Sequence, residues 1–329
     1  MIIPFPEVPA SGGDCGFPGY TPAMTNMSHD QATDIRDQSW VDRFAPVRMR
    51  PYFRLARLDR PIGTWLLLLP CWWSLALASP GWPDPYVIAL FGVGAVVMRG
   101  AGCTVNDLAD RNFDSQVART ALRPIPSGDV SVFQAFAYLG LLCAIGLTIL
   151  LQFNTFTIGL GVLSLALVIT YPFMKRITYW PQAVLGLTFN WGALMGWASV
   201  HGDLAPAPLV MYATGLFWTL GYDTIYAHQD KEDDVLIGVK STALKFGAQT
   251  RRWLMLFYAL TISGLGLSGY LADVGWPFYA ALAGGAIHLI WQIRTLDTEA
   301  PKNCLRRFKS NRDFGLLIFA GIVASRVLS

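Results

Sequence analysis

The chain has 329 residues, of which 53% are hydrophobic and only 14% are charged. About a quarter of the residues in an ordinary soluble protein are charged, so this composition excludes that class and indicates a membrane protein with several spans. The net charge is only +3 and the basic residues lie in separate short segments, which is not typical of nucleic-acid binding. The five cysteines and four histidines have no metal-binding spacing, so we expect neither zinc nor haem.

Residues 1–46 differ from the rest of the chain, because they are rich in Pro, Gly, Asp and Ser and have no sustained hydrophobic period. This composition is typical of disorder. We therefore predict a disordered tail over residues 1–46 and one transmembrane domain over residues 47–329. Residues 47–60 combine arginines with aromatic and aliphatic side chains, as expected of an amphipathic helix on an anionic membrane surface.

Apolar runs alternate with short polar breaks over the rest of the chain, and each run is close to the length of about 20 residues that a helix needs to cross a bilayer. The predicted fold is an all-α bundle of nine transmembrane helices, at residues 62–79, 86–106, 132–151, 155–174, 182–200, 207–226, 253–272, 276–293 and 313–328. Lys and Arg are concentrated before the first run and after the second, fourth, sixth and eighth, whereas the intervening loops contain none. By the positive-inside rule, the N-terminus faces the cytoplasm.

The second apolar run ends in an acidic and then basic segment, RGAGCTVNDLADRNFDSQVARTALRPIPSG, at residues 99–128. Asp107, Asp110 and Asp114 are spaced i, i+3 and i+7, which places three carboxylates on one face of a helix. Because such carboxylates repel one another, this face indicates a bound cation, best Mg²⁺, or exposure to water. A solvated loop of mixed charge is the alternative that this segment alone leaves open.

The acidic pattern occurs a second time at the end of the sixth apolar run. Asp223 and Asp230 lie seven residues apart there, and Tyr226 lies one turn after Asp223. Acidic clusters in corresponding places of two halves predict a single site that both clusters face.

Four segments in this order, NDLADRNFD, RTALRPIPSG, YPFMKRITYWPQ and DTIYAHQDKEDDVLIGVKSTALKFG, resemble the intramembrane aromatic prenyltransferases of the UbiA family. The resemblance covers roughly residues 47–329. It implies a helical bundle with a central cavity that opens to the cytoplasmic side of a bacterial inner membrane, or alternatively lies in the mitochondrial inner membrane. It also implies transfer of a polyprenyl group from polyprenyl diphosphate to the ring carbon ortho to the hydroxyl of 4-hydroxybenzoate, in ubiquinone biosynthesis. Other branches of the family use other aromatic acceptors, and that alternative stays open.

The resemblance also implies roles for individual residues. The expected Mg²⁺ ligands are Asn106, Asp107, Asp110, Asp114, Asp223 and Asp230, and the expected catalytic groups are Asp110, Asp114, Asp223 and Asp230. The cations that match the family's positions for the leaving pyrophosphate are Arg60, Arg119, Arg123 and Lys175. Metal and cations would stabilise the charge that develops on that group. Tyr226 is expected to contact the leaving group or the acceptor, and the alternative is an ordinary buried tyrosine.

Arg99 is the candidate for binding the carboxylate of the acceptor. It lies seven residues before Asn106, hence on about the same helical face, and a guanidinium so near an apolar span requires an anionic partner. A guanidinium also matches a carboxylate with two parallel hydrogen bonds. The alternative is an ion pair between Arg99 and one of the aspartates.

Two functions from other classes are also compatible with paired aspartates in a membrane protein. A cation-coupled transporter could use them as ion sites, but their position at helix ends beside phosphate-type cations favours a diphosphate. A non-catalytic scaffold would predict that alanine at the aspartates is harmless.

Overall fold

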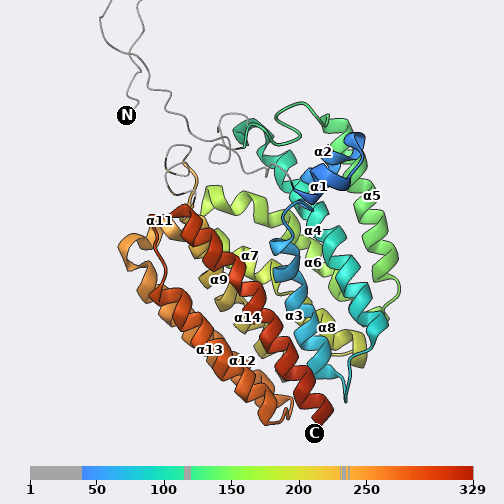
Figure 1. The fold of residues 1–329 in the computed structure, drawn as a ribbon. Coiled ribbons are helices and arrows are strands. Elements are labelled where there is room, and N and C mark those ends of the chain that lie inside the picture. Colours follow the sequence, from blue (N-terminus) through green and yellow to red (C-terminus); the bar gives the residue numbers. More distant parts are fainter. Residues whose placement is uncertain (1–38, 115–119, 230, 232–234, 236–237, 329) are drawn as a thin grey trace, which may run out of the picture.

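The computed structural model describes residues 39–114, 120–229, 231, 235 and 238–328, and the regular structure of these residues is helical, without a strand. This confirms the predicted all-α class. The long helices are α3 (Ile62–Ala78), α4 (Pro85–Asp114), α5 (Val132–Leu150), α6 (Thr155–Ile177), α9 (Pro206–Ala227), α12 (Thr250–Leu271), α13 (Trp276–Arg294) and α14 (Pro301–Leu328). The shorter ones are α1 (Trp40–Phe44), η1 (Val47–Met49), α2 (Arg50–Leu55), α7 (Pro181–Phe189), α8 (Gly192–His201), α11 (Thr242–Phe246) and η2 (Gly247–Gln249). In Figure 1 the long helices pack side by side as a bundle.

Each of the nine predicted spans coincides with helical structure, but three differ from the prediction. The second continues to Asp114 and does not end at residue 106. The fifth is broken at Asn190 and Trp191 into α7 and α8. The Asn190 side-chain amide donates to the carbonyl oxygen of Gly186 at 2.8 Å and to Thr219 Oγ1 on α9 at 2.8 Å, so it competes with the backbone ladder at the break. The last helix, α14, begins at Pro301 and not at residue 313.

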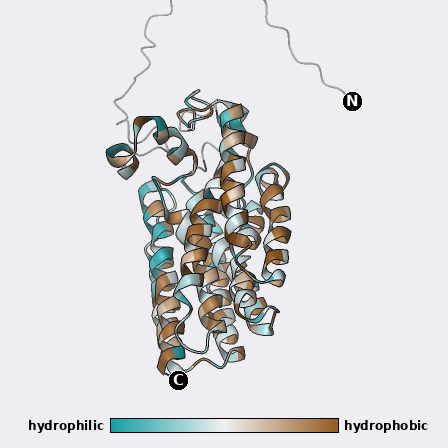
Figure 2. Ribbon diagram, turned by 90° about the vertical axis from the view of Figure 1, so that its right-hand side faces the viewer, coloured by the Kyte–Doolittle hydropathy of each residue, from teal (hydrophilic) through white to brown (hydrophobic). Residues whose placement is uncertain are grey.

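Several helices have the length and composition of membrane spans. Among the described residues, five helical stretches are long and apolar enough to cross a membrane: Pro85–Arg111, Val132–Leu150, Thr155–Ile177, Pro181–His201 and Thr242–Leu271. Hydrophobic residues cover much of the length of the bundle in Figure 2. By their length and composition, these stretches support the class of polytopic membrane protein, and the number of nine crossings stays a prediction.

The N-terminal segment before α3 is folded onto the bundle from Ser39 onward. Residues 1–38 of the predicted tail lie outside the described residues, but Trp40–Phe44 form the short helix α1, where we expected no structure. The predicted amphipathic helix over residues 47–60 is divided into η1 and α2. Leu55 of α2 is buried together with Leu108 of α4, which fixes this segment against the end of α4 that carries the first acidic motif.

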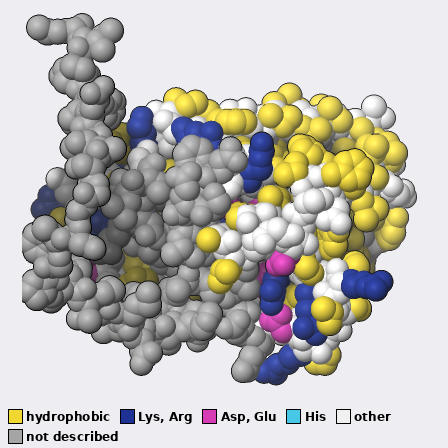
Figure 3. Space-filling view, turned by 90° about the horizontal axis from the view of Figure 1, so that it is seen from above, with side chains coloured by type: hydrophobic (Ala, Val, Ile, Leu, Met, Phe, Trp, Pro, Cys, Tyr) yellow, Lys and Arg dark blue, Asp and Glu magenta, His cyan; other side chains and the backbone are white. Residues whose placement is uncertain are grey.

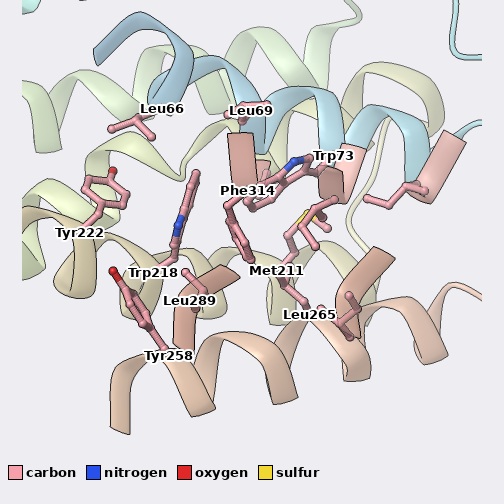
Figure 4. Packing of buried hydrophobic residues seen from close by; sticks show 14 of the residues in the cluster. Leu66, Leu69, Trp73, Met211, Trp218, Tyr222, Tyr258, Leu265, Leu289 and Phe314 are labelled. Atoms are coloured by element: carbon pink, nitrogen blue, oxygen red, sulfur yellow. The ribbon is translucent and has the colours of Figure 1, made fainter. Parts of the chain in front are cut away.

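The main core lies where α3, α9 and α14 meet (Figure 4). The ring centroids of Trp73 and Trp218 are 4.9 Å apart, and those of Trp218 and Phe314 are 5.6 Å apart. Both indole N–H groups are satisfied, since Trp73 donates to the Gly315 carbonyl at 2.7 Å and Trp218 donates to Asn311 Oδ1 at 3.0 Å. Buried indoles with satisfied N–H groups fix the orientation of their helices, and α9 carries Asp223 five residues after Trp218.

Candidate active site

The first acidic motif is helical throughout, because α4 continues to Asp114. Asp107, Asp110 and Asp114 share one face of the helix, as their spacing predicted, and all three are buried. The alternative of a solvated loop is therefore wrong for these carboxylates. Buried carboxylates require compensating charge, and the structure supplies it from three other segments of the chain.

Arg57 and Arg123 bind two of the three carboxylates. Both oxygens of Asp107, which is 0% exposed, accept from Arg57 Nη2 at 2.8 and 3.0 Å. Arg123 Nη1 lies 3.3 Å from Asp107 Oδ1 and 2.8 Å from Asp114 Oδ2. Burial raises the pKa of Asp114, the Arg123 guanidinium opposes that shift, and the charges of Asp107 and Asp110 add to it.

Asp110, the middle carboxylate, binds the end of α6. Lys175 Nζ contacts Asp110 Oδ2, and Arg176 Nη2 donates to Asp110 Oδ1 at 3.1 Å. The Lys175 and Arg176 side chains are 30% and 39% exposed, whereas Arg57 is 9% exposed. Because water screens exposed charges, the partners of Asp110 are more easily exchanged than Arg57, the main partner of Asp107.

Arg57 and Arg176 were not predicted from the sequence as partners of the acidic motif. Arg57 has a φ of 57°, the left-handed region that a residue other than glycine rarely adopts, and nothing in its sequence neighbourhood signals that conformation. Arg176 directly follows Lys175, which was predicted, so the paired cations of YPFMKR offered a signal for it. Arg60 was expected to bind phosphate and pairs with Asp59 at 3.1 Å.

The second acidic motif reaches the same interior. Asp223 lies on α9 and is partly buried, and the ring of Tyr226, one turn later, is 4.6 Å from that of Phe308. Asp223, Arg99 and Asp110 all lie near enough to the partly buried Tyr171 of α6 for their charges to act on its hydroxyl. The structure therefore brings together the two acidic helices and Arg99, whereas Asp230 and Arg119 lie outside the described residues.

Arg99 lies on α4 between two uncharged neighbours. Its Cζ is 5.3 Å from the centre of the Phe189 ring, at the end of α7, and its guanidinium contacts Gly63 at the start of α3. In the part of the chain that the structure describes, Arg99 forms no ion pair with a carboxylate. The alternative of an internal ion pair is therefore wrong for the described residues.

The metal site predicted from the two motifs is only partly described. Among residues 39–114, 120–229 and 238–328, no three His, Cys, Asp or Glu side chains are grouped closely enough to hold a metal ion. The donor chemistry nevertheless fits Mg²⁺, which prefers carboxylate and amide oxygens, because Asn106, Asp110 and Asp114 follow one side of α4. Figure 3, which looks onto the upper end of the bundle in Figure 1, shows Lys and Arg side chains over the described surface with acidic ones beside them.

Comparison with known sequences identifies close relatives. A model of the UbiA prenyltransferase family matches residues 67–319. The 4-hydroxybenzoate polyprenyltransferase, mitochondrial, of Arabidopsis thaliana is 55% identical over 308 residues, which make up 93% of this chain and 76% of the relative. The protein of the same name from Homo sapiens is 55% identical over 282 residues, 85% of this chain and 76% of the relative.

Solved structures share the fold. A UbiA homolog from Aeropyrum pernix K1 has a TM-score of 0.67 and 24% identity, over 79% of this chain and 97% of that one. A UbiA homolog from Archaeoglobus fulgidus bound to GPP and Mg²⁺ has a TM-score of 0.62 and 19% identity, over 85% of this chain and 100% of that one. At these identities the likeness establishes the arrangement of the helices.

Proposed function

Because the chain belongs to the UbiA prenyltransferase family, as its four motifs predicted, we propose that it transfers a polyprenyl group from a polyprenyl diphosphate to 4-hydroxybenzoate in ubiquinone biosynthesis. In this reaction the bond between the allylic carbon and the diphosphate oxygen breaks. The allylic carbon then forms a bond with the ring carbon ortho to the hydroxyl, and that ring carbon loses its proton. Pyrophosphate is released as the second product. The names of relatives that are 55% identical support this acceptor, and another aromatic acceptor is the alternative.

The observation that carries the proposal is the buried acidic face of α4, on which Asp110 and Asp114 pair with cations that are partly exposed. A diphosphate is an anion that binds both to carboxylates, through Mg²⁺, and directly to Lys and Arg. Mg²⁺, when bound, would neutralise the charge that develops on the departing pyrophosphate. The residues that we propose to hold it are Asn106, Asp110, Asp114, Asp223 and Asp230.

The cations would bind the oxygens of the diphosphate itself. Lys175 and Arg123 lie next to Asp110 and Asp114, and Arg60 and Arg119 are proposed to complete the set. We assign Asp107 to the ion pair with Arg57 and not to the metal, because both of its oxygens already accept from that guanidinium.

Arg99 would bind the carboxylate of the acceptor. Its neighbours Phe189 and Gly63 are apolar, and Arg99 forms no ion pair with a carboxylate among the described residues. An apolar surrounding also keeps water from the allylic cation until the ring captures it. Tyr226, one turn after Asp223, is proposed to contact the leaving group or the acceptor.

The proposed setting is a membrane in which one domain, residues 47–329, follows an N-terminal tail. The site would open to the side that carries the basic loops, the cytoplasmic side by the positive-inside rule. The expectation of a bacterial inner membrane has no support from the relatives, whose names say mitochondrial. The mitochondrial inner membrane, the alternative from the sequence, fits those names.

The test is a product assay in membranes that contain the protein. Membranes are incubated with radiolabelled 4-hydroxybenzoate, a polyprenyl diphosphate and Mg²⁺, and a lipid-soluble labelled product is expected. Membranes with an equal amount of the Asp110→Asn variant serve as the control. If folded wild-type protein yields no label in the organic phase, the proposal is wrong. If labelled homogentisate is prenylated faster than 4-hydroxybenzoate, the acceptor assignment is wrong.

A further inference from the structure

Gly63 and Arg99 approach each other more closely than any side chain on residue 63 would allow. A Cβ atom built on Gly63 would lie 2.6 Å from Arg99 Nε, 2.8 Å from Nη2 and 2.9 Å from Cζ. Ordinary contacts between such atoms are about 3.5–4.0 Å. The position of the guanidinium therefore depends on the missing side chain of Gly63.

The helix itself does not require glycine at this position. Gly63 belongs to α3 and is buried, and its φ lies outside the left-handed region. Alanine is favoured over glycine in a helix, and the atoms that a methyl group would displace are the far end of a flexible side chain. An alanine at residue 63 is therefore compatible with folding, and its main effect should be to displace the Arg99 guanidinium.

The contact with Gly63 determines which edge of the guanidinium can meet the acceptor. The atoms nearest to Gly63 are Nε and Nη2, so the edge formed by Nη1 and Nη2 is the one that could bind a carboxylate bidentately. The Phe189 ring holds Cζ through a cation–π contact at 5.3 Å. Neither neighbour offers a carboxylate, so together they orient the cation without neutralising its charge.

We propose that Gly63 and Phe189 are positioning residues that hold the Arg99 guanidinium for the carboxylate of the acceptor, and so make the site selective for an aromatic acid. This inference rests on the proposed function. It extends that function from the residue that binds the acid to the residues that set its specificity.

Steady-state kinetics of Gly63→Ala test the proposal, with acceptor and polyprenyl diphosphate varied separately. A displaced guanidinium loses a charge-assisted contact, so KM for 4-hydroxybenzoate should rise about ten- to a hundredfold. KM for the polyprenyl diphosphate should stay within about twofold, because Arg99 does not bind the donor in this scheme. For Phe189→Leu, the loss of a cation–π contact should raise KM for the acceptor about two- to tenfold.

A second readout separates positioning from loss of packing. The uncharged 4-hydroxybenzamide has the ring and hydroxyl of the acid, so the ratio of kcat/KM for acid over amide reports the contact with Arg99. That ratio should fall about tenfold or more in Gly63→Ala. Gly140→Ala on α5 is the matched control, since a Cβ there has nothing within 4 Å, and it should leave both KM values and the ratio unchanged.

The possible outcomes distinguish a failure of the positioning role from a failure of the proposed function. If wild-type protein prenylates 4-hydroxybenzoate but Gly63→Ala keeps the acid-to-amide ratio, the positioning role is wrong and the proposed function stands. The same holds if both KM values rise equally. If Gly63→Ala does not fold, the ratio in Phe189→Leu takes its place, and an unchanged ratio there overturns the proposal. If wild-type protein makes no product from the acid, the proposed function itself has failed.

Discussion

The ion pair between Arg57 and Asp107 is the contact whose loss should be felt most strongly in the stability of the acidic face. We expect Arg57→Met to lower the free energy of unfolding by about 2–4 kcal/mol. Breaking one side of a buried pair costs about 3–5 kcal/mol, and Asp107 is fully buried with both oxygens bound to Arg57. Arg123, 3.3 Å from Asp107, should recover about 1 kcal/mol of that loss. Methionine is chosen because any residue with a Cβ bears similar strain at a φ of 57°.

The measurement is an SDS titration of the purified protein, followed by the loss of helical circular dichroism. The double variant Arg57→Met/Asp107→Asn removes the unpaired charge and should recover most of the loss. Arg54→Met is the control, because Arg54 pairs with Asp42 in the same segment but both side chains are partly exposed, and its effect should be under about 1 kcal/mol. If Arg57→Met unfolds at the wild-type SDS fraction, or the double variant is no more stable than the single one, the reasoning is refuted.

Further predictions concern the reaction itself. Chelation with EDTA should abolish turnover and added Mg²⁺ should restore it, because we propose that the metal bridges the anionic diphosphate to the aspartates of both motifs. Full activity in excess EDTA would contradict the metal-bridged site. Asp110→Asn and Asp223→Asn should each lower turnover about a hundredfold or more, measured at equal protein insertion, whereas Asp203→Asn, in a loop remote from both motifs in sequence, should match the wild type. Arg99→Lys should raise KM for 4-hydroxybenzoate about ten- to a hundredfold and leave KM for the polyprenyl diphosphate unchanged. Arg119→Lys should raise KM for the polyprenyl diphosphate and leave KM for 4-hydroxybenzoate unchanged. If Arg99→Lys raises only KM for the donor, Arg99 belongs to the diphosphate site.

Helix boundaries were predictable from the sequence where the helix is apolar throughout. They were less predictable where polar side chains pack inside the bundle. The first half of α14 was missed because many of its residues are charged or polar. The structure nonetheless buries the polar side chains of Arg307 and Asn311. Arg307 lies 3.9 Å from the centre of the Trp291 ring, and Asn311 accepts from the Trp218 indole. Hydropathy averages cannot detect such contacts, since their partners come from other helices.

The acidic face of α4 was predictable for a simple geometric reason, because spacing within one helix determines which side chains share a face. Its counterions were not predictable in the same way. Arg57 lies 50 residues before Asp107 and Arg176 lies 66 residues after Asp110, and no spacing rule links positions on different elements. Arg123 and Lys175 were predicted as phosphate partners, and the structure places both on carboxylates.

Lys175 shows how the two halves can act on one substrate. Its side chain contacts Asp110 of the first motif, and its carbonyl accepts from the Lys240 backbone N–H at 2.9 Å, just after the second motif. An ammonium that is 30% exposed could turn from Asp110 to an arriving diphosphate, because Arg176 also binds that carboxylate and a metal ion would take the place of Lys175. Substrate and metal would then bind together, because each would lower the electrostatic cost of the other's binding. A buried carboxylate with a partly exposed partner is thus suited to become a metal ligand, which Asp107, held by the buried Arg57, is not.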